Sequence, residues 1–277
     1  MCGIIGYCGP RPAADILLEG LKRLEYRGYD SAGICVRSDG ALHVHKRKGK
    51  IADLRAHLPE KVDGETGIGH TRWATHGGVT DVNAHPHTDG SGKIAIVHNG
   101  IIENYASLRE KLEEDGYRFI TETDSEVIAH LIASLYDGDL ERALKQAVTL
   151  LKGTYGIAAM HVDEPGRLVG ARNGSPLVLG IGDGEMFLAS DVTAIIAHTK
   201  QVIYLEDGEV VTLTADTCHT TDLKDRQVDK KIDFISWELE EIEKEGYAHY
   251  MEKEILEQPE SINRAMQGRI DLEYATG

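Results

Sequence analysis

A cysteine stands directly after the first methionine, in the opening stretch MCGIIGYCG. Once that methionine is removed, Cys2 carries a thiol and a free α-amine on the same residue. An α-amine has a reference pKa of about 7.7–8.0, so it can accept the proton of the thiol near neutral pH. The same kind of pairing activates N-terminal threonine nucleophiles. Cys2 is therefore a candidate nucleophile, and the alternative is a cysteine that only begins a buried strand.

The stretch HTRWATHGG, residues 70–78, gathers groups suited to a charged ligand. The guanidinium of Arg72 is planar and matches a carboxylate with two parallel hydrogen bonds. Thr75 and His76 add polar groups nearby. The glycines at the end would let the segment fold over a ligand, with Trp73 as an apolar cover. The alternative is an ordinary strand end with a structural arginine and a packed tryptophan.

A second candidate element of a catalytic site is VHNGIIEN, residues 97–104, where a predicted strand ends at Asn99 and Gly100. A side-chain amide and an unhindered backbone N–H at adjacent residues can together bind an oxyanion. Asn-Gly is also a strong signal for a hairpin turn. On these two residues alone, a turn is the better interpretation.

The stretch ETDSE, residues 122–126, predicts the start of a helix. Thr123 is expected to cap the helix, and Glu126 three residues later completes a capping box. Asp124 would then lie in the first turn, where the helix dipole favours an ionised carboxylate. Such a carboxylate can bind an ammonium group, but an ordinary acidic first turn would look the same.

Several histidines lie close together in this part of the chain, which raises the question of a zinc site. Structural zinc sites usually show cysteines and histidines at tight, regular spacing, and catalytic ones often show HExxH. Neither pattern is present, so we expect no metal and interpret most of these residues as hydrogen-bonded structural histidines. They are His70, His76, His85, His87 and His98.

Hydrophobic periodicity predicts the helices and strands that must position these segments. Apolar residues recur at helical spacing at about 12–26, 105–112, 123–135 and 140–151. Ten short β-like runs are bounded by Gly, Asp, Asn or Pro, and the last of them is QVIYLEDGEVVTL at 201–213. Strands and helices come in blocks without strict alternation, which favours an α+β fold with antiparallel sheets over a doubly wound parallel sheet.

Composition limits the possible partners. The chain has 277 residues, a formal net charge of −16 and a pI of about 5.2. It lacks the surplus of basic residues that nucleic acids or anionic membranes attract, so we expect neither as a partner. The four cysteines show no CxxC spacing, and no signal peptide or membrane-spanning run is evident. We therefore expect a cytoplasmic protein.

Together, and in this order, the motifs resemble the class II glutamine amidotransferases, whose glutaminase domains are N-terminal-nucleophile hydrolases. LEYRGYDSAG and HTRWATHG are most similar to the branch in which this domain precedes a sugar-isomerase half. The resemblance implies an α+β fold, a four-layer αββα sandwich with two central antiparallel sheets. The segments that carry it are MCGIIGY (1–7), LEYRGYDSAG (24–33), HTRWATHG (70–77), NAHPH (83–87), VHNGIIEN (97–104), ETDSEVIAHLI (122–132), ASD (189–191) and HYMEKEILEQP (249–259).

The resemblance implies a role for each candidate residue in glutamine hydrolysis. Cys2 matches the family nucleophile, and Asn99 with Gly100 matches its oxyanion hole. Arg72 matches the residue that binds the α-carboxylate of glutamine, and Asp124 the residue that binds its α-ammonium. No metal or organic cofactor is implied.

Four further positions are implied with less direct roles. Trp73 matches a lid tryptophan that closes the site and gates ammonia. Thr75 and His76 fall in the same glutamine-binding stretch. Arg27 matches an arginine close to the nucleophile and is expected to position it.

The resemblance also implies a domain organisation. Residues 1–237 are expected to form the glutamine amidotransferase domain, and 238–277 an acidic connector and the start of a sugar-isomerase half whose core lies outside the 277 residues. In the longer enzyme, ammonia would convert fructose 6-phosphate to glucosamine 6-phosphate, and we expect a homo-oligomer. Three alternatives remain: a glutaminase half feeding another acceptor, a catalytically silent glutamine-binding or docking module, and a metal protein.

Overall fold

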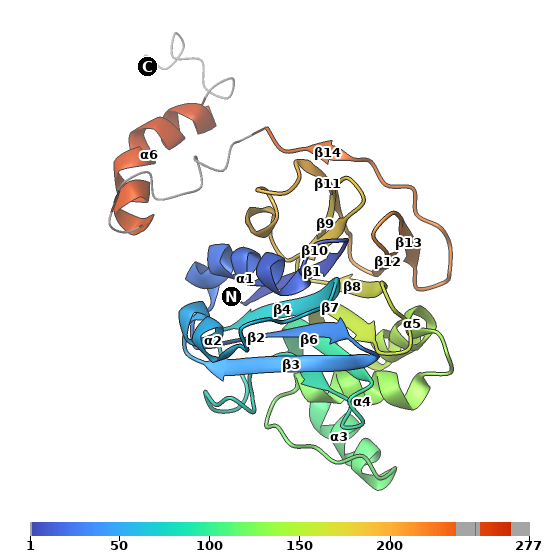
Figure 1. Cartoon of the computed structure of the whole chain (residues 1–277). Helices are drawn as coiled ribbons and strands as arrows, with labels where there is room; N and C mark the ends of the chain where they lie inside the picture. The colour runs from blue at the N-terminus through green and yellow to red at the C-terminus, as the bar shows by residue number, and fades with distance from the viewer. Residues whose placement is uncertain (1, 237–246, 248–249, 267–277) are drawn as a thin grey trace, which may run out of the picture. The chain divides into compact units, whose positions relative to one another are not determined.

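The computed structural model describes residues 2–236, 247 and 250–266 (Figure 1). The chain divides into two compact units, Met1–Ile235 and Ser236–Gly277. The acidic segment 237–246 and most of the predicted connector lie outside the described residues, as does Met1. The assignment of 238–277 as a connector and the start of a second half therefore stays a prediction.

The first unit contains an eight-stranded antiparallel sheet. It places β1, which follows Cys2, at the middle of the sheet between β10 and β4. In spatial order its strands are β14 (Asp233–Phe234), β11 (Gln201–Tyr204), β9 (Val178–Ile181), β10 (Met186–Ala189), β1 (Gly3–Cys8), β4 (Thr66–Arg72), β2 (Ser31–Ser38) and β3 (Ala41–Lys48).

A six-stranded antiparallel sheet packs against the first one. Its longest pair is β6 with β7, and β6 contacts β1 and β4 of the other sheet. In spatial order its strands are β13 (Cys218–Asp222), β12 (Glu209–Leu213), β8 (Leu168–Asn173), β7 (Gly153–His161), β6 (Ile94–Ile102) and β5 (His87–Thr88).

Helices cover the outer face of each sheet (Figure 1). The helices α1 (Ala13–Leu24) and α2 (Ile51–His57) pack on the eight-stranded sheet. On the six-stranded sheet lie α4 (Ser125–Leu135) and α5 (Leu140–Leu150), with α3 (Tyr105–Glu114) against α4. The four layers confirm the predicted αββα sandwich of an α+β protein.

Alternation along β6 shows how the core is divided between layers. Ile94 and Ile96 belong to the core shared with the helices, whereas Ala95 and Val97 belong to the core between the sheets. All four are essentially inaccessible to solvent. Because side chains alternate across a strand, one nine-residue strand contributes to both cores.

Three expectations about local structure were wrong. The run 201–213 is two strands, because the chain turns at Gly208 (φ +83°), and β11 and β12 belong to different sheets. Asn99 and Gly100 do not end a strand or form a turn, since β6 continues to Ile102. The helix α2 and the strands β5, β13 and β14 were not predicted.

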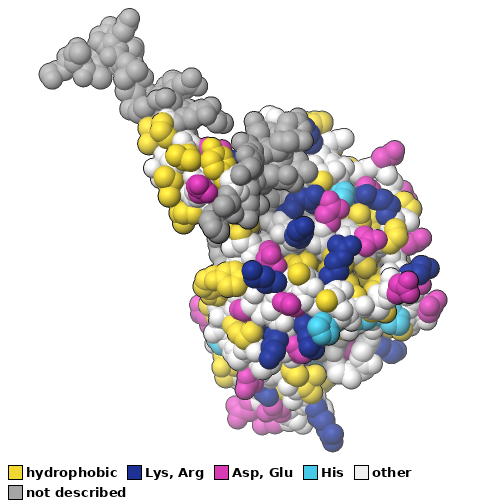
Figure 2. Space-filling view, turned by 60° about the vertical axis from the view of Figure 1, so that its left-hand side comes forward, with side chains coloured by type: hydrophobic (Ala, Val, Ile, Leu, Met, Phe, Trp, Pro, Cys, Tyr) yellow, Lys and Arg dark blue, Asp and Glu magenta, His cyan; other side chains and the backbone are white. Residues whose placement is uncertain are grey.

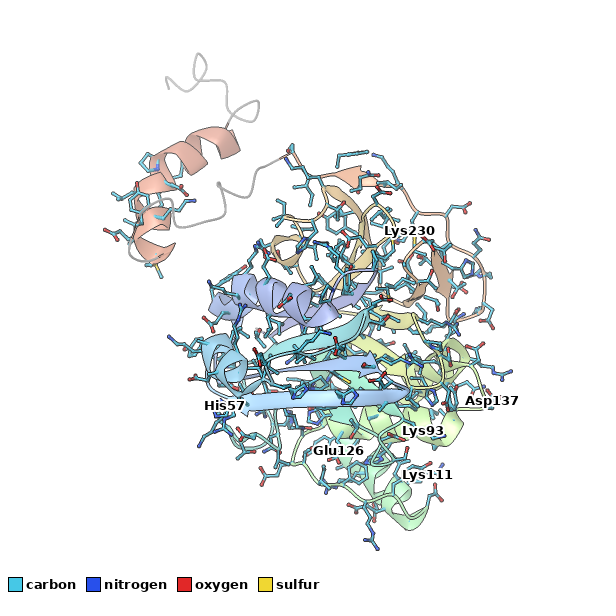
Figure 3. All side chains as sticks on the ribbon, in the orientation of Figure 1. His57, Lys93, Lys111, Glu126, Asp137 and Lys230 are labelled. Atoms are coloured by element: carbon cyan, nitrogen blue, oxygen red, sulfur yellow. The ribbon has the colours of Figure 1, made fainter. Side chains whose placement is uncertain are left out.

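The third concerns the start of α4, where the capping box does not form. The helix begins at Ser125 with Asp124 at the N-cap position, and no side chain caps it. The carboxylate of Glu126, which is labelled in Figure 3, instead accepts hydrogen bonds from the backbone N–H groups of Ile120 and Thr121, at 2.8 and 2.7 Å. Glu126 thus fixes the segment that leads into the helix.

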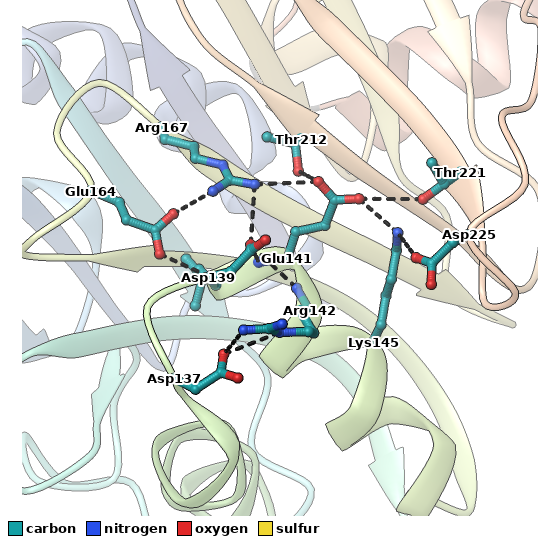
Figure 4. A network of polar contacts seen from close by, with 11 residues as sticks. Asp137, Asp139, Glu141, Arg142, Lys145, Glu164, Arg167, Thr212, Thr221 and Asp225 are labelled. Carbon is teal, nitrogen blue, oxygen red and sulfur yellow. Dashed lines mark hydrogen bonds and ion pairs between the residues drawn. The ribbon is translucent and has the colours of Figure 1, made fainter.

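A network of charged side chains joins α5 to the strands beside it (Figure 4). Both oxygens of Glu141 are bonded: Oε1 accepts from Lys145 at 2.7 Å, and Oε2 from Thr212 at 2.6 Å. Lys145 also reaches Asp225 at 2.7 Å, and Arg167 reaches Glu141 at 3.3 Å. Since these groups come from α5, β12 and the loops after β7 and β13, the network holds α5 against the six-stranded sheet.

The second unit contains the helix α6 (Tyr250–Met266). Apolar side chains are exposed along it, as Figure 2 shows in yellow. They are Met251, Ile255, Leu256 and Ile262, each more than half exposed.

Candidate active site

One cavity of about 350 Å³ is lined by every residue that the sequence singled out for catalysis or binding. This volume falls in the usual range for small-molecule sites. The residues come from the start of β1, the segment before β2, the end of β4 and the loop after it, the middle of β6 and the start of α4. They are Cys2, Arg27, Arg72, Trp73, Thr75, His76, Asn99, Gly100 and Asp124.

Cys2 directly precedes β1, whose first residue, Gly3, pairs with Thr71 of β4. The Trp73 backbone N–H donates to the Cys2 sulfur at 3.2 Å. Burial raises the pKa of the Cys2 thiol, and the hydrogen bond from Trp73 only partly offsets this. The thiol therefore needs a base to become a nucleophile at neutral pH.

Two contacts on the neighbouring strand fix the start of β1. The Ile4 N–H donates to the Ser190 hydroxyl at 2.9 Å, and the Ser190 N–H donates to the Ile4 carbonyl at 3.0 Å. The next residue, Asp191, pairs with Arg27 at 2.8 Å. Arg27 is thereby held at the cavity wall.

Asn99 connects the two sheets beside Cys2. Its side-chain Nδ2 donates to the Cys2 carbonyl at 3.1 Å. The neighbouring Gly100 has φ +135°, and a Cβ there would lie 2.0 Å from the Thr154 carbonyl oxygen. Only glycine fits this position, and Gly100 itself lines the cavity.

Arg72 is buried, and its guanidinium holds the loop that follows β4. It donates to the carbonyls of His76, Gly77 and Gly78, the last two at 3.4 and 3.2 Å. From the other side, Asn83 donates to the Gly78 carbonyl at 3.0 Å. The backbone of 76–78 is thus held by two buried side chains, the guanidinium of Arg72 and the amide of Asn83.

Trp73 is about half exposed at the edge of the cavity. Its ring meets that of Tyr29 edge to face, with the centroids 5.6 Å apart. The carboxylate of Asp30 accepts from the N–H of Ala74, directly after the tryptophan. These contacts tie the start of the loop to the segment before β2.

Asp124 faces the cavity from the N-terminus of α4. Its Oδ2 accepts from the Ile102 N–H at 2.8 Å, and its Oδ1 lies 4.0 Å from Nδ1 of His76. The carboxylate is almost fully buried, at 5% side-chain exposure. Thr75, in contrast, is exposed at the rim.

The buried histidines form a stack beside the cavity. The rings of His70 and His85 are 4.0 Å apart and nearly parallel, and His87 meets His85 edge to face at 4.3 Å. Burial lowers the pKa of His70 to about 3, and it lowers the pKa values of His85 and His87 well below their usual range. Within the described residues, no group of three or more His, Cys, Asp or Glu is placed to hold a metal ion.

Sequence reasoning missed part of the cavity wall. Ser190 lies in the ASD segment that contributed to the resemblance, but its contact with Ile4, 186 residues away, had no local signal. The other wall residues not predicted are His85, His98, Ile101, Thr123, Ser125, Thr154, Ser175 and Pro176.

Residues 70–197 match the model of a glutamine amidotransferase domain family. The chain is 52% identical over 276 residues to a glutamine–fructose-6-phosphate aminotransferase (isomerizing) of Aquifex aeolicus, covering 99% of this chain and 47% of the relative. An enzyme of the same name from Thermus thermophilus is also 52% identical, over 100% of this chain and 46% of the relative. The chain thus spans about half the length of the curated relatives it matches.

Among solved structures, the fold is similar to a glutamine phosphoribosylpyrophosphate amidotransferase from B. subtilis, with a TM-score of 0.69 and 29% identity. That match covers 80% of this chain and 49% of the other. Fold and cavity together define a glutamine amidotransferase domain of the N-terminal-nucleophile hydrolase type. Within this class the chain belongs to the glutamine–fructose-6-phosphate aminotransferase family, as its glutaminase half.

No helix in the described part of the chain is long and apolar enough to cross a membrane.

Proposed function

We propose that this chain hydrolyses L-glutamine to glutamate and ammonia, with Cys2 as the nucleophile. The observation that carries the proposal is the convergence of nine predicted residues, from five separate segments of the chain, on one cavity. A silent binding module would need the ligand-binding groups, but it would not need a thiol beside an amide donor and an obligatory glycine.

In the proposed mechanism, removal of Met1 exposes the α-amine of Cys2, which takes the proton of the thiol. This supplies the base that the raised pKa of Cys2 calls for. The thiolate attacks the side-chain amide carbon of glutamine, and the negative charge moves to the amide oxygen. Asn99 Nδ2 and the Gly100 N–H stabilise that oxyanion, and each such donor is worth about 2.7–4 kcal/mol.

The tetrahedral intermediate then collapses. Its carbon–nitrogen bond breaks, and the α-ammonium of Cys2 returns its proton to the departing nitrogen, which leaves as ammonia. Water attacks the resulting thioester, releases glutamate and restores the thiol. The reaction balances with one glutamine and one water giving one glutamate and one ammonia.

Substrate recognition falls to the two buried charges of the cavity. Arg72 binds the α-carboxylate of glutamine, and the buried carboxylate of Asp124 binds the α-ammonium through Oδ1, which in the structure accepts only a long hydrogen bond from the Ser125 hydroxyl at 3.5 Å. Thr75 and His76 add polar contacts, and Trp73 covers the bound substrate. Because both charged ends of free glutamine are bound, a glutamine residue inside a polypeptide, which lacks those charges, is excluded as a substrate.

We further propose that the longer protein passes the ammonia to a sugar-isomerase half that converts fructose 6-phosphate to glucosamine 6-phosphate, and that it forms a homo-oligomer. The names of the relatives support the acceptor. We place the reaction in the cytoplasm, because all four cysteines are unpaired, as in proteins of reducing compartments.

The test combines a label with a turnover assay. Intact mass is measured before and after treatment with a diazo-ketone analogue of glutamine, and glutamate release is measured separately. We expect a chain without Met1, one adduct mapped to Cys2 and blocked by glutamine, and steady glutamate release. Processed protein that binds glutamine but neither reacts nor turns over would establish the silent binding module instead.

A further inference from the structure

His70 is buried between the two sheets and has no role in the mechanism so far. It lies on β4, where alternate residues point toward the six-stranded sheet. Ile68 on that face belongs to the core between the sheets, and Arg72 on the same face reaches the cavity. His70 sits between them with no solvent exposure. A polar ring at such a position costs free energy unless its hydrogen bonds are used.

The acceptors around His70 determine which nitrogen carries the proton. Its Nε2 lies 3.1 Å from the His98 carbonyl oxygen, which can only accept. Nε2 must therefore be protonated, and the second atom within reach, Asn99 Oδ1 at 3.0 Å, must accept as well. The Nδ1 of His70 has no hydrogen-bond partner among the described residues.

This assignment fixes the orientation of the Asn99 amide. With Oδ1 held by His70, Nδ2 points toward the Cys2 carbonyl, which is also acceptor-only and lies 3.1 Å away. An amide nitrogen has two hydrogens. One is used on Cys2, and the other is left for a ligand in the cavity. A flipped amide would present Oδ1 to both the Cys2 carbonyl and a developing oxyanion, and it would repel them.

We propose that His70 is a positioning residue, which holds the Asn99 amide with its donor toward the reacting carbonyl. The inference rests on the proposed glutaminase function and deepens it. His85 stacks on the His70 ring at 4.0 Å and limits its rotation. His70 itself does not line the cavity wall, so its effect on the reaction passes through Asn99.

The experiment compares substitutions that differ in where they place a donor. His70→Gln puts an amide N–H near the position of Nε2, whereas His70→Asn carries the same amide on a shorter side chain. His70→Leu removes the donor at similar volume. Each is made in the wild-type chain and in the Asn99→Ala background. Glutaminase kcat and KM are measured, together with the rate of Cys2 alkylation by iodoacetamide, which forms no tetrahedral oxyanion.

We expect His70→Leu and His70→Asn to lower kcat by about 10-fold or more, and by less than the about 10²–10³-fold expected for Asn99→Ala. His70→Gln should lie closer to wild type. KM and the alkylation rate should change by no more than about twofold, since the fold and the thiol are intact. In the Asn99→Ala background, His70→Leu should lower kcat no further.

Equal kcat values for His70→Gln and His70→Asn would overturn the proposal. So would a loss that is undiminished in the Asn99→Ala background, or an alkylation rate that falls in parallel with kcat, since either marks a general structural defect. If His70→Leu does not fold, the comparison of kcat between His70→Gln and His70→Asn still tests the proposal. Failure of the wild-type chain to hydrolyse glutamine would instead contradict the proposed function.

Discussion

The charged network on α5 and the surroundings of the cavity beside Cys2 differ in whether their polar groups have hydrogen-bond partners. In the network, Glu141 has both oxygens bonded and Lys145 has two carboxylate partners. Beside the cavity, buried Nδ1 atoms of His70, His85 and His87 have no hydrogen-bond partner in the described part of the chain. The comparison indicates that the bonded network contributes to stability, whereas the unpaired histidine nitrogens beside the cavity cost stability.

Cys2→Ala is expected to have the largest effect, and it tests whether the cavity and the network contribute separately to activity and to stability. Loss of a nucleophile lowers kcat by several orders of magnitude, up to about 10⁶-fold in well-studied hydrolases. We expect glutamate release to fall below detection while the free energy of unfolding changes by less than about 1 kcal/mol. Turnover and urea unfolding of one preparation give both values. A large loss of stability would show that the cavity also holds the fold together.

Asp124→Asn should separate binding from folding at the other end of the cavity. The asparagine oxygen can still accept from the Ile102 N–H, but the charge that would bind an ammonium is gone. A charge-assisted hydrogen bond is worth about 1.5–3 kcal/mol, so KM for glutamine should rise about 10- to 100-fold. Steady-state kinetics measures this, and an unchanged KM would contradict the role assigned to Asp124.

Glu141→Gln should have the opposite signature. Burial raises the pKa of Glu141, but the hydrogen bonds from Lys145 and Thr212 outweigh it and leave the pKa lowered. Loss of this charge should reduce the free energy of unfolding by about 2 kcal/mol and leave kcat unchanged. The matched control is Arg142→Ala, which breaks the exposed pair with Asp137 and should leave the urea midpoint within experimental error of wild type. Equal losses of stability in Glu141→Gln and Arg142→Ala would show that the network stabilises the fold no more than an exposed ion pair does.

A change of pH should have the smallest effect and act through the histidines. The pKa of His70 is lowered to about 3 by burial, against an ordinary value of 6.5. Below pH 6.5 the unfolded chain binds a proton that the folded chain excludes, so folding is disfavoured as the pH falls. Between pH 7 and 5.5 the wild type should lose about 1 kcal/mol relative to His70→Leu. Urea unfolding of both at each pH measures the difference, and parallel curves would contradict it.

Residue types at the site were predictable, but the backbone that presents them was not. Chemistry alone indicated that Arg72 can bind a carboxylate and that Asp124 can bind an ammonium group, whereas only the family resemblance assigned these roles toward glutamine. The turn favoured by Asn99–Gly100 was wrong because β6 pairs with β7 through these residues, and the close approach to Thr154 is a tertiary constraint.

The same limit explains the other misses. Glu126 has the spacing of a capping box, but backbone N–H groups of an irregular segment compete for its carboxylate. The strands β11 and β12 are consecutive and read as one run, and only the packing of two sheets separates them. Most of the clustered histidines were predicted to be hydrogen-bonded, and His70 is one that is, but its partners on β6 could not be identified from local pattern.

The hold of Arg72 on the loop after β4 has an energetic consequence for ligands. Three of its five N–H donors serve the backbone carbonyls of residues 76–78, which leaves two for a ligand carboxylate. In the proposed binding mode, one guanidinium therefore holds the loop and the ligand at the same time. Loop order and ligand affinity are then thermodynamically linked, so a substitution in residues 76–78 should change the affinity for glutamine without touching it.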